Sequence, residues 1–172
     1  PVKGFDQLIF AWKKVSEKHP DWELHIFGDD YLGTKEKLFT QIKEHNLSQV
    51  VHIKESVSDL PNTMLNYSIY VMSSKTECFP MVLLEAMSVG LPIVSYDCPN
   101  GPKNIISNQI DGILVEDQQI EALVNGINLL IESQNLRKKM GGQAKIKATK
   151  FETKKVMQQW LNLFKKLKRT PL

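Results

Sequence analysis

The sequence predicts an α/β fold in which helices cover both faces of a doubly wound parallel sheet. Short strand-like segments alternate with longer amphipathic segments, at a spacing of about 20 to 25 residues that is typical of βαβ units. The strand-like segments are short and apolar, as expected for strands that are covered on both faces. With 172 residues, of which 42% are hydrophobic and 24% charged, the chain is long enough to bury the core of one domain.

Hydrophobic periodicity and breaking residues give each element in order. Phe5, Leu8, Ile9, Trp12 and Val15 fall on one face of a first helix, which His19-Pro20-Asp21 should end. Strands are expected at residues 23–27, 50–53, 69–72, 91–96 and 112–115. Further helices are expected from Thr34 onward, over 61–66 and 81–89, in a short turn after residue 102, and over 118–133, 135–150 and 153–168.

Composition excludes several classes of protein. The formal net charge of +3 is too small to indicate nucleic-acid binding. Cys78 and Cys98 form no C-x-x-C pair, so we expect two thiols in a reducing compartment. We find no apolar run of the roughly 18 residues that a membrane span needs, and no secretory signal pattern.

The turn between the strand at 69–72 and the helix at 81–89 is the most informative segment. Pro80 is expected at the first helical position, where its missing N–H costs nothing. The amides of Met81, Val82 and Leu83 would then lack partners within the helix. Because the start of a helix carries partial positive charge, it suits a phosphate group. The alternative is an ordinary turn that binds nothing.

Two carboxylates bracket this turn, Glu77 in the loop and Glu85 one turn into the helix. Carboxylates in that position could accept hydrogen bonds from the vicinal hydroxyls of a ribose or another sugar. For Glu85 alone, the alternative is a solvated charge on the helix surface.

Four motifs in the same order resemble those of the retaining glycosyltransferases of family 4, which have the GT-B fold. The first is the E-x7-E pattern of Glu77 and Glu85, set in the sequence ECFPMVLLEAMSVGLPIVS. The others are Lys3-Gly4-Phe5-Asp6, the loop at 97–102 with the sequence DCPNGP, and the segment at 111–115 with the sequence DGILV. The resemblance covers nearly the whole chain and is closest to the bacterial members that form polysaccharides and lipopolysaccharides.

The resemblance implies a role for each matching residue. Lys3 would contact the diphosphate of the donor, Glu85 would hold the ribose hydroxyls, and Glu77 would contact the transferred sugar. Gly28 would let the chain approach the donor closely, and the base would lie near Ile53 on backbone groups. The turn itself would complete the substrate site through Phe79, Pro80, Met81 and Val82.

The implied activity is a retaining, metal-independent glycosyltransferase of the hexosyltransferase type. Its donor would be a UDP- or GDP-sugar and its acceptor a glycan or a lipid-linked sugar, with no cofactor. The sequence contains no Asp-x-Asp, and its histidines show no metal-ligand spacing with Cys or Asp, so we predict no metal site. His25 and His52 are expected on strands.

The resemblance also implies two parts. Residues 1–150 would form a nucleotide-sugar-binding, Rossmann-like domain that lacks its first strand, and we interpret the sequence as a piece of a longer protein. The Gly-Arg element that normally precedes the lysine and the acceptor-binding N-terminal domain would also be missing, so this piece alone should be inactive. Residues 151–172 would form a helix that crosses back to that domain, with an apolar stripe of Val156, Trp160, Leu163, Phe164 and Leu167. The alternative is packing of this stripe on its own domain.

We expect a cytoplasmic protein. The basic group Lys165, Lys166, Lys168 and Arg169 is interpreted as a solvated helix end, and the alternative is contact with an anionic membrane surface.

Two features of the sequence leave alternatives open. Cys78 stands where the family usually has glycine, which allows a degenerate module that binds sugar nucleotides without catalysis. A receiver-like signalling domain could use Asp29 and Asp30 as an acidic pocket, but the lysine it needs after the strand at 91–96 is absent.

Overall fold

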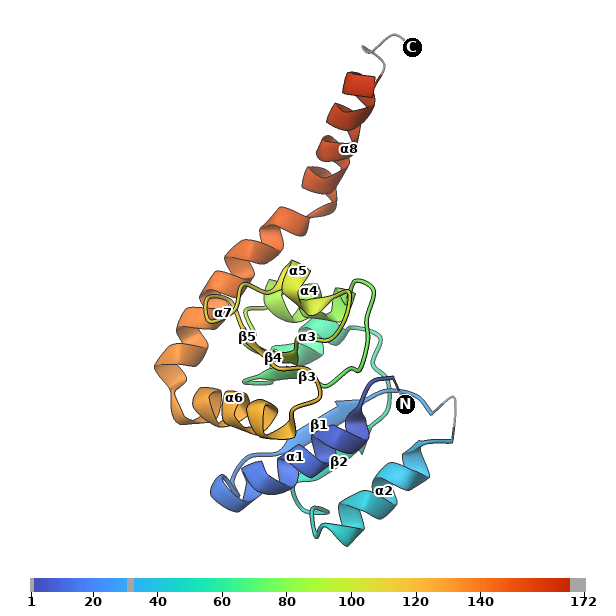
Figure 1. Cartoon of the computed structure of the whole chain (residues 1–172), viewed down its shortest axis with the longest axis vertical. Coiled ribbons are helices and arrows are strands. Elements are labelled where there is room, and N and C mark those ends of the chain that lie inside the picture. The colour runs from blue at the N-terminus through green and yellow to red at the C-terminus, as the bar shows by residue number, and fades with distance from the viewer. Residues whose placement is uncertain (1, 31–32, 168–172) are drawn as a thin grey trace.

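The computed structural model describes residues 2–30 and 33–167, and its parallel strands and intervening helices confirm the predicted α/β class (Figure 1). The strands lie close to their predicted positions. They are β1 (Leu24–Phe27), β2 (Val51–Lys54), β3 (Tyr70–Met72), β4 (Ile93–Tyr96) and β5 (Ile113–Val115). The helices are α1 (Phe5–Lys18), α2 (Lys35–Glu44), α3 (Leu60–Met64), α4 (Met81–Ser88), α5 (Pro102–Ile105), α6 (Ile120–Glu132), α7 (Gln134–Ala148), η1 (Thr149–Phe151) and α8 (Thr153–Leu167).

The core is built from the helix faces that periodicity predicts. In α1 the buried side chains are Leu8, Ile9, Ala11, Trp12 and Val15. Helix α1 packs against α6 and α2, and α6 also covers β4 and β5. Strand β4 is buried along its whole length, because helices lie on both of its faces.

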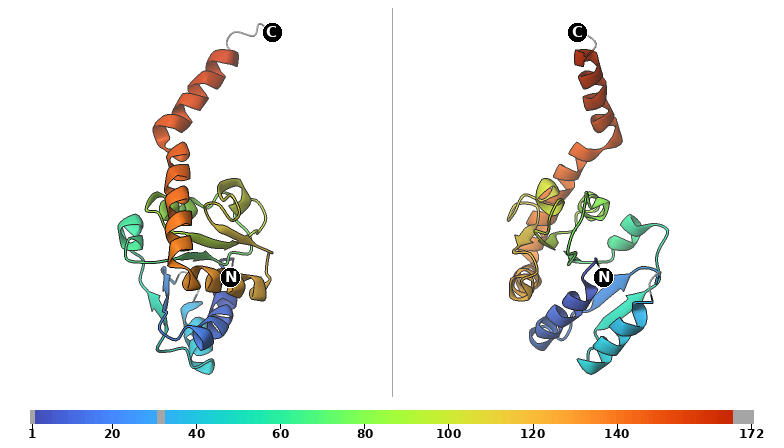
Figure 2. Two further views of the ribbon diagram at one scale, coloured as in Figure 1. Left: turned by 90° about the vertical axis from the view of Figure 1, so that its left-hand side faces the viewer. Right: turned by 45° about the vertical axis from the view of Figure 1, so that its right-hand side comes forward.

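The parallel strands form two hydrogen-bonded sheets in the described part of the chain, whereas the sequence predicts one. One sheet pairs β1 with β2, and the other has the order β3-β4-β5. Figures 1 and 2 show the two-stranded sheet, with α1 and α2, on one side of the three-stranded sheet. Between β1 and β3 lies a groove of about 510 Å³, lined on one side by residues 24–27 and on the other by residues 69–71. Trp12, Val82 and Ile127 contribute apolar surface to it. The two sheets therefore turn one edge each toward a shared apolar groove.

Close packing of α7 on α4 depends on a pair of glycines. A β-carbon on Gly141 of α7 would lie only 2.0 Å from the carbonyl oxygen of Gly90, which follows α4. Real β-carbons do not approach an oxygen so closely, so the missing side chain lets the two backbones touch.

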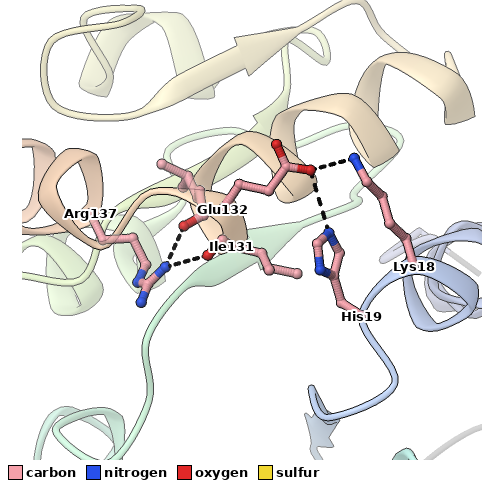
Figure 3. A network of polar contacts seen from close by, with 6 residues as sticks. Lys18, His19, Ile131, Glu132 and Arg137 are labelled. Atoms are coloured by element: carbon pink, nitrogen blue, oxygen red, sulfur yellow. Dashed lines mark hydrogen bonds and ion pairs between the residues drawn. The ribbon is translucent and has the colours of Figure 1, made fainter.

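Polar contacts join the ends of α1 and α6 (Figure 3). Glu132 at the end of α6 pairs with Lys18 and lies 3.6 Å from Nε2 of His19. Arg137 of α7 donates from Nη1 to the carbonyl oxygens of Leu130 and Ile131, at 2.6 and 2.8 Å. These bonds satisfy carbonyl groups that the end of α6 would otherwise leave without a partner.

Helix α8 projects away from the rest of the structure (Figures 1 and 2). It packs against η1, and none of its described residues is buried. The alternative, in which its apolar stripe packs on its own domain, is therefore wrong, because Trp160, Leu163, Phe164 and Leu167 are all exposed. Of the basic group near the C-terminus, Lys168 and Arg169 lie outside the described residues. Within residues 2–30 and 33–167, no helix has the length and apolar character that crossing a membrane requires.

Candidate functional site

The predicted site lies at the carboxyl end of β3, where the N-terminal segment meets the loop before α4. The amide of Lys75 donates to the carbonyl oxygen of Val2 at 2.8 Å. The hydroxyl of Ser73 donates to the carbonyl oxygen of Lys3 at 2.9 Å. Gly4 has φ +65°, and a β-carbon there would lie 2.1 Å from the carbonyl oxygen of Ser73. The glycine of the Lys3-Gly4 motif therefore lets Lys3 lie against the end of β3.

Lys3 and Glu77, both predicted as catalytic, are in direct contact. Nζ of Lys3 donates to Oε1 of Glu77 at 2.8 Å. The Glu77 side chain is only 12% exposed, whereas that of Lys3 is 56% exposed. The buried hydroxyl of Ser74 donates to the same Glu77 oxygen at 2.7 Å. The Glu77 carboxylate is thus held by the ammonium group of Lys3 and the hydroxyl group of Ser74.

Sequence reasoning missed the part played by Ser74, which was considered only as the end of a strand. The available signal was a polar pair, Ser73-Ser74, directly after an apolar strand in a parallel sheet. Side chains in that position point toward the edge where such sheets bind ligands.

The loop at 97–102 fixes the backbone around Glu77. The amide of Glu77 donates to the carbonyl oxygen of Pro99 at 3.3 Å. A β-carbon on Gly101 would lie 3.0 Å from Cβ of Glu77 and 3.0 Å from Cδ of Pro80. Both are tighter than ordinary contacts, so a glycine at 101 allows this loop to pack against the turn.

Helix α4 begins at Met81, as the predicted range 81–89 gives, but the role predicted for Pro80 is wrong. Pro80 is the N-cap rather than the first helical residue, because its ψ of 93° is extended and its carbonyl oxygen accepts from the amide of Leu83 at 3.0 Å. The Leu83 amide is therefore used, contrary to the prediction. Within the described residues, the amides of Met81 and Val82 donate to no protein acceptor. These two amides remain available to an anion.

Glu85 lies on α4 and is half-buried. Its side chain makes no hydrogen bond or ion pair with any residue in the described ranges. Burial raises the pKa of the Tyr70 phenol, and the negative charges of Glu77 and Glu85 raise it further. Both carboxylates are therefore within electrostatic reach of one tyrosine on β3.

The remaining predicted residues lie around this centre in different ways. Gly28 directly follows β1 with φ +154°, which favours glycine, and the space where a β-carbon would stand is open. The Ile53 side chain is partly buried against the core and lines a small second pocket with Phe39 and Ile42 of α2. Phe79 is 45% exposed and lies beside Phe151, with ring centroids 6.1 Å apart.

The receiver-like alternative depends on Asp29 and Asp30, and Asp30 has a structural role. The Asp30 carboxylate accepts from the amides of Thr34 and Lys35, at 2.7 and 3.2 Å, and so caps the start of α2. The Asp30 half of the acidic pair is therefore accounted for by this cap.

Comparison with known proteins assigns the family. The family described as "Glycosyl transferases group 1" matches residues 1–147. The chain belongs to this family. Its fold is that of the C-terminal domain of GT-B glycosyltransferases, which confirms the resemblance noted from the four motifs.

Individual relatives agree with this assignment. An uncharacterized glycosyltransferase of Haemophilus influenzae is 34% identical over 92% of this chain and 44% of its own length. A crystal structure of a variant of Staphylococcus aureus TarM with UDP, fondaparinux and alpha-GlcNAc-glycerol is 26% identical, with a TM-score of 0.86 over 95% of this chain and 33% of that one.

A third relative is a C-terminal domain solved by itself. The C-terminal domain of the group 1 family protein LpcC of Francisella tularensis is 25% identical, with a TM-score of 0.77 over 86% of this chain and 78% of that one. The chain therefore spans less than half of the Haemophilus influenzae relative and most of this isolated domain.

Proposed function

We propose that the full-length protein is a retaining glycosyltransferase and that this chain supplies its donor-binding half. The observation that carries the proposal is the arrangement around one turn. Lys3 contacts Glu77, the free amides of Met81 and Val82 open α4, and Glu85 lies one turn along the same helix. A cation and helix amides suit a diphosphate, and the two carboxylates suit sugar hydroxyls.

The proposed chemistry is electrostatic. Negative charge develops on the nucleoside diphosphate as it departs from the sugar. Lys3 and the start of α4 are already in place to stabilise that charge, so they need no reorganisation during the reaction. In our proposal these groups, with an arginine from the preceding Gly-Arg element, take the part that a metal ion plays in other sugar transferases.

The transfer step follows from the family resemblance. The bond between the anomeric carbon and the phosphate oxygen breaks, and the acceptor hydroxyl oxygen bonds to that carbon on the same face. The proton of the acceptor hydroxyl goes to the departing phosphate oxygen. Glu77 would lie against the transferred sugar, and its hydrogen bond from Ser74 would hold its carboxylate in one orientation.

We propose a UDP- or GDP-sugar as donor, and a glycan or lipid-linked sugar bound by the N-terminal domain as acceptor, in the cytoplasm. The TarM crystals that contain UDP support a uridine nucleotide for a protein of this fold. The half-buried Glu85, which has no partner within the described residues, would accept from the ribose hydroxyls.

We further propose that the groove between β1 and β3 receives a parallel strand from a preceding part of the longer protein. Both edges lining it belong to parallel sheets, and its walls are apolar. A strand running parallel to β1 and β3 would end at their carboxyl ends. Val2 and Lys3 lie at that end of β3, which supports a short connection from such a strand into α1.

We propose that α8 docks on the N-terminal domain. Its stripe of exposed apolar side chains needs a partner surface, and residues 2–30 and 33–152 do not provide one. The alternative is contact with the inner face of a membrane, in which Lys165 and Lys166 would face anionic lipid. Trp160→Ser in the full-length protein should lower its melting temperature if the helix docks on the domain. Loss of sedimentation with anionic vesicles, at an unchanged melting temperature, would indicate the membrane instead.

Calorimetric titration of the full-length protein with UDP and with GDP tests the donor site. We expect one of the two to bind. Glu85→Ala should weaken that binding, whereas Glu77→Ala should reduce turnover more than binding. If neither nucleotide binds at millimolar concentration, the proposal is wrong.

Two further measurements test the finer parts of the proposal. Proton NMR of the product should show the same anomeric configuration as the donor, and inversion would contradict a retaining reaction. Turnover should survive treatment with a chelator. Loss of turnover that only added metal restores would contradict the metal-independent mechanism.

A further inference from the structure

A second cluster of chemistry-bearing side chains lies at the opposite ends of the strands from the donor site. Side chains alternate along a strand, so Glu23, just before β1, and His25 within it point to the same face. The register pairs His25 of β1 with His52 of β2, which brings both imidazoles to that face. Sequence spacing does not show this group, because the residues are adjacent only across the two strands.

The distances in this cluster match those around a tetrahedral ion. Oε2 of Glu23 lies 2.9 Å from Nε2 of His25 and 3.4 Å from Nε2 of His52. All three ligand atoms lie within 4.8 Å of one another. Zinc ligands about 2.0–2.1 Å from a tetrahedral ion lie about 3.3 Å apart. An ion could therefore be bound with small side-chain rotations.

Tyr67 offers a partner to the second ring nitrogen of His25. Nε2 of His25 lies 2.9 Å from Oε2 of Glu23 and donates to it, while Nδ1 lies 2.7 Å from the Tyr67 hydroxyl oxygen and accepts from it. If an ion replaced the proton on Nε2, the ring would carry its proton on Nδ1 and donate it to the Tyr67 oxygen. Metal-bound histidines usually have a partner of this kind on the second nitrogen.

We propose that Glu23, His25 and His52 bind one divalent transition-metal ion, with Zn²⁺ as the best fit, and that solvent completes its coordination. Two imidazoles and one carboxylate favour Zn²⁺ over Mg²⁺ or Ca²⁺, which prefer oxygen ligands. As ligands the two imidazoles would bind through neutral nitrogens, and the Glu23 carboxylate would supply the one negative charge of the site. The Glu23 side chain is 55% exposed, and Glu23 and His25 also line the groove between β1 and β3.

The proposed ion would join the amino ends of β1 and β2. Within the described residues these strands form a sheet of two members, and a cross-link between them would stabilise their pairing. The donor site is at the carboxyl ends of the strands and shares none of these residues. This inference therefore does not depend on the proposed function.

Titration of the tag-free, chelator-treated full-length protein with Zn²⁺ tests the site. We expect one tight site per chain, and the Co²⁺-loaded protein should show the visible absorption of a four-coordinate ion. His52→Gln should weaken this site at least about tenfold, because it removes one ligand. Tyr67→Phe keeps all three ligands and should still weaken it by about 10–100-fold, the usual effect of losing a partner behind a ligand.

His45→Gln is the matched control, since His45 lies on another face, beside Phe10. It should leave Zn²⁺ affinity unchanged, and circular dichroism should be the same for all variants. The proposal is overturned if the wild-type protein shows no such site, or if His52→Gln and His45→Gln bind Zn²⁺ equally well. UDP affinity measured with and without Zn²⁺ should not change, which separates this test from that of the donor site.

Discussion

Lys3 and Glu77 are separated by 74 positions, yet Nζ of Lys3 lies 2.8 Å from Oε1 of Glu77. The ion pair is half in solvent, so by itself it stabilises the fold by no more than about 1 kcal/mol. Its interest is chemical, because it places a cation at the loop that leads into α4. A diphosphate bound there would accept a hydrogen bond from the Lys3 ammonium group that now contacts Glu77.

Lys3→Met should weaken binding of the nucleoside diphosphate to the full-length protein. A hydrogen bond to a charged group contributes about 1.5–3 kcal/mol, which corresponds to roughly a ten- to hundredfold loss of affinity. Calorimetry with UDP or GDP measures the change. Lys75→Met is the matched control, because Lys75 is exposed and its main chain, not its ammonium group, makes the contact with Val2. Equal losses in both variants would show that general charge, rather than Lys3, attracts the nucleotide.

Ser74→Ala should reduce turnover while leaving nucleotide affinity nearly unchanged. The substitution removes the hydroxyl that donates to Glu77 at 2.7 Å, so the carboxylate is free to rotate away from the sugar. A loss of roughly tenfold or more in kcat is expected for a hydrogen bond to a charged group. Ser88→Ala removes a similar hydroxyl from the exposed face of α4 and should have no effect. A fall in nucleotide affinity that matches the fall in kcat would contradict this assignment.

The sequence predicted the elements well because their signals are local. The buried face of α1 follows from its spacing, and each strand was placed within about two residues, as is usual for element boundaries. The four motifs also placed Lys3 and Glu77 in one predicted site, and these two side chains are in contact. What failed depends on contacts between distant segments: Ser74 as a partner of Glu77, and the division of the strands into two sheets.

The cluster of Glu23, His25 and His52 is a second case in which sequence spacing did not reveal a contact between distant segments. Each histidine was correctly expected on a strand, but their adjacency depends on the register of β1 and β2. Register is set by the turn, by α2 and by the apolar face beneath, so no spacing along the chain reveals it. Pro80 likewise looked like a first helical residue, and only its backbone angles make it the cap.

Two neighbouring glycines in α7 should respond in opposite directions to alanine. Gly141→Ala would press a methyl group onto the carbonyl oxygen of Gly90, so we expect a loss of about 1–3 kcal/mol of stability. Gly142→Ala meets nothing within 4 Å and should stabilise the helix by about 0.5–1 kcal/mol. Thermal melting of the full-length protein would show one variant below the wild type and the other above it. Similar melting temperatures for both would mean that α7 does not pack closely on α4.

The contact between Glu132 and Lys18 should make stability depend on pH in a defined range. The hydrogen bond from Lys18 is the main cause that lowers the pKa of Glu132 below its ordinary value of 4.5, and the charges of Lys18 and His19 contribute. Because the folded pKa is depressed, the contact stabilises the protein fully above the unfolded value and less as the pH falls through the folded value. Lys18→Met should therefore lower the melting temperature near neutral pH, and its difference from the wild type should shrink below about pH 4.

Carboxyl NMR should show the pKa of Glu132 rising in this variant. Lys139→Met removes the same charge from an exposed position and should leave that pKa unchanged. If both variants shift it equally, the overall charge of the protein, rather than the Lys18 contact, sets the pKa of Glu132.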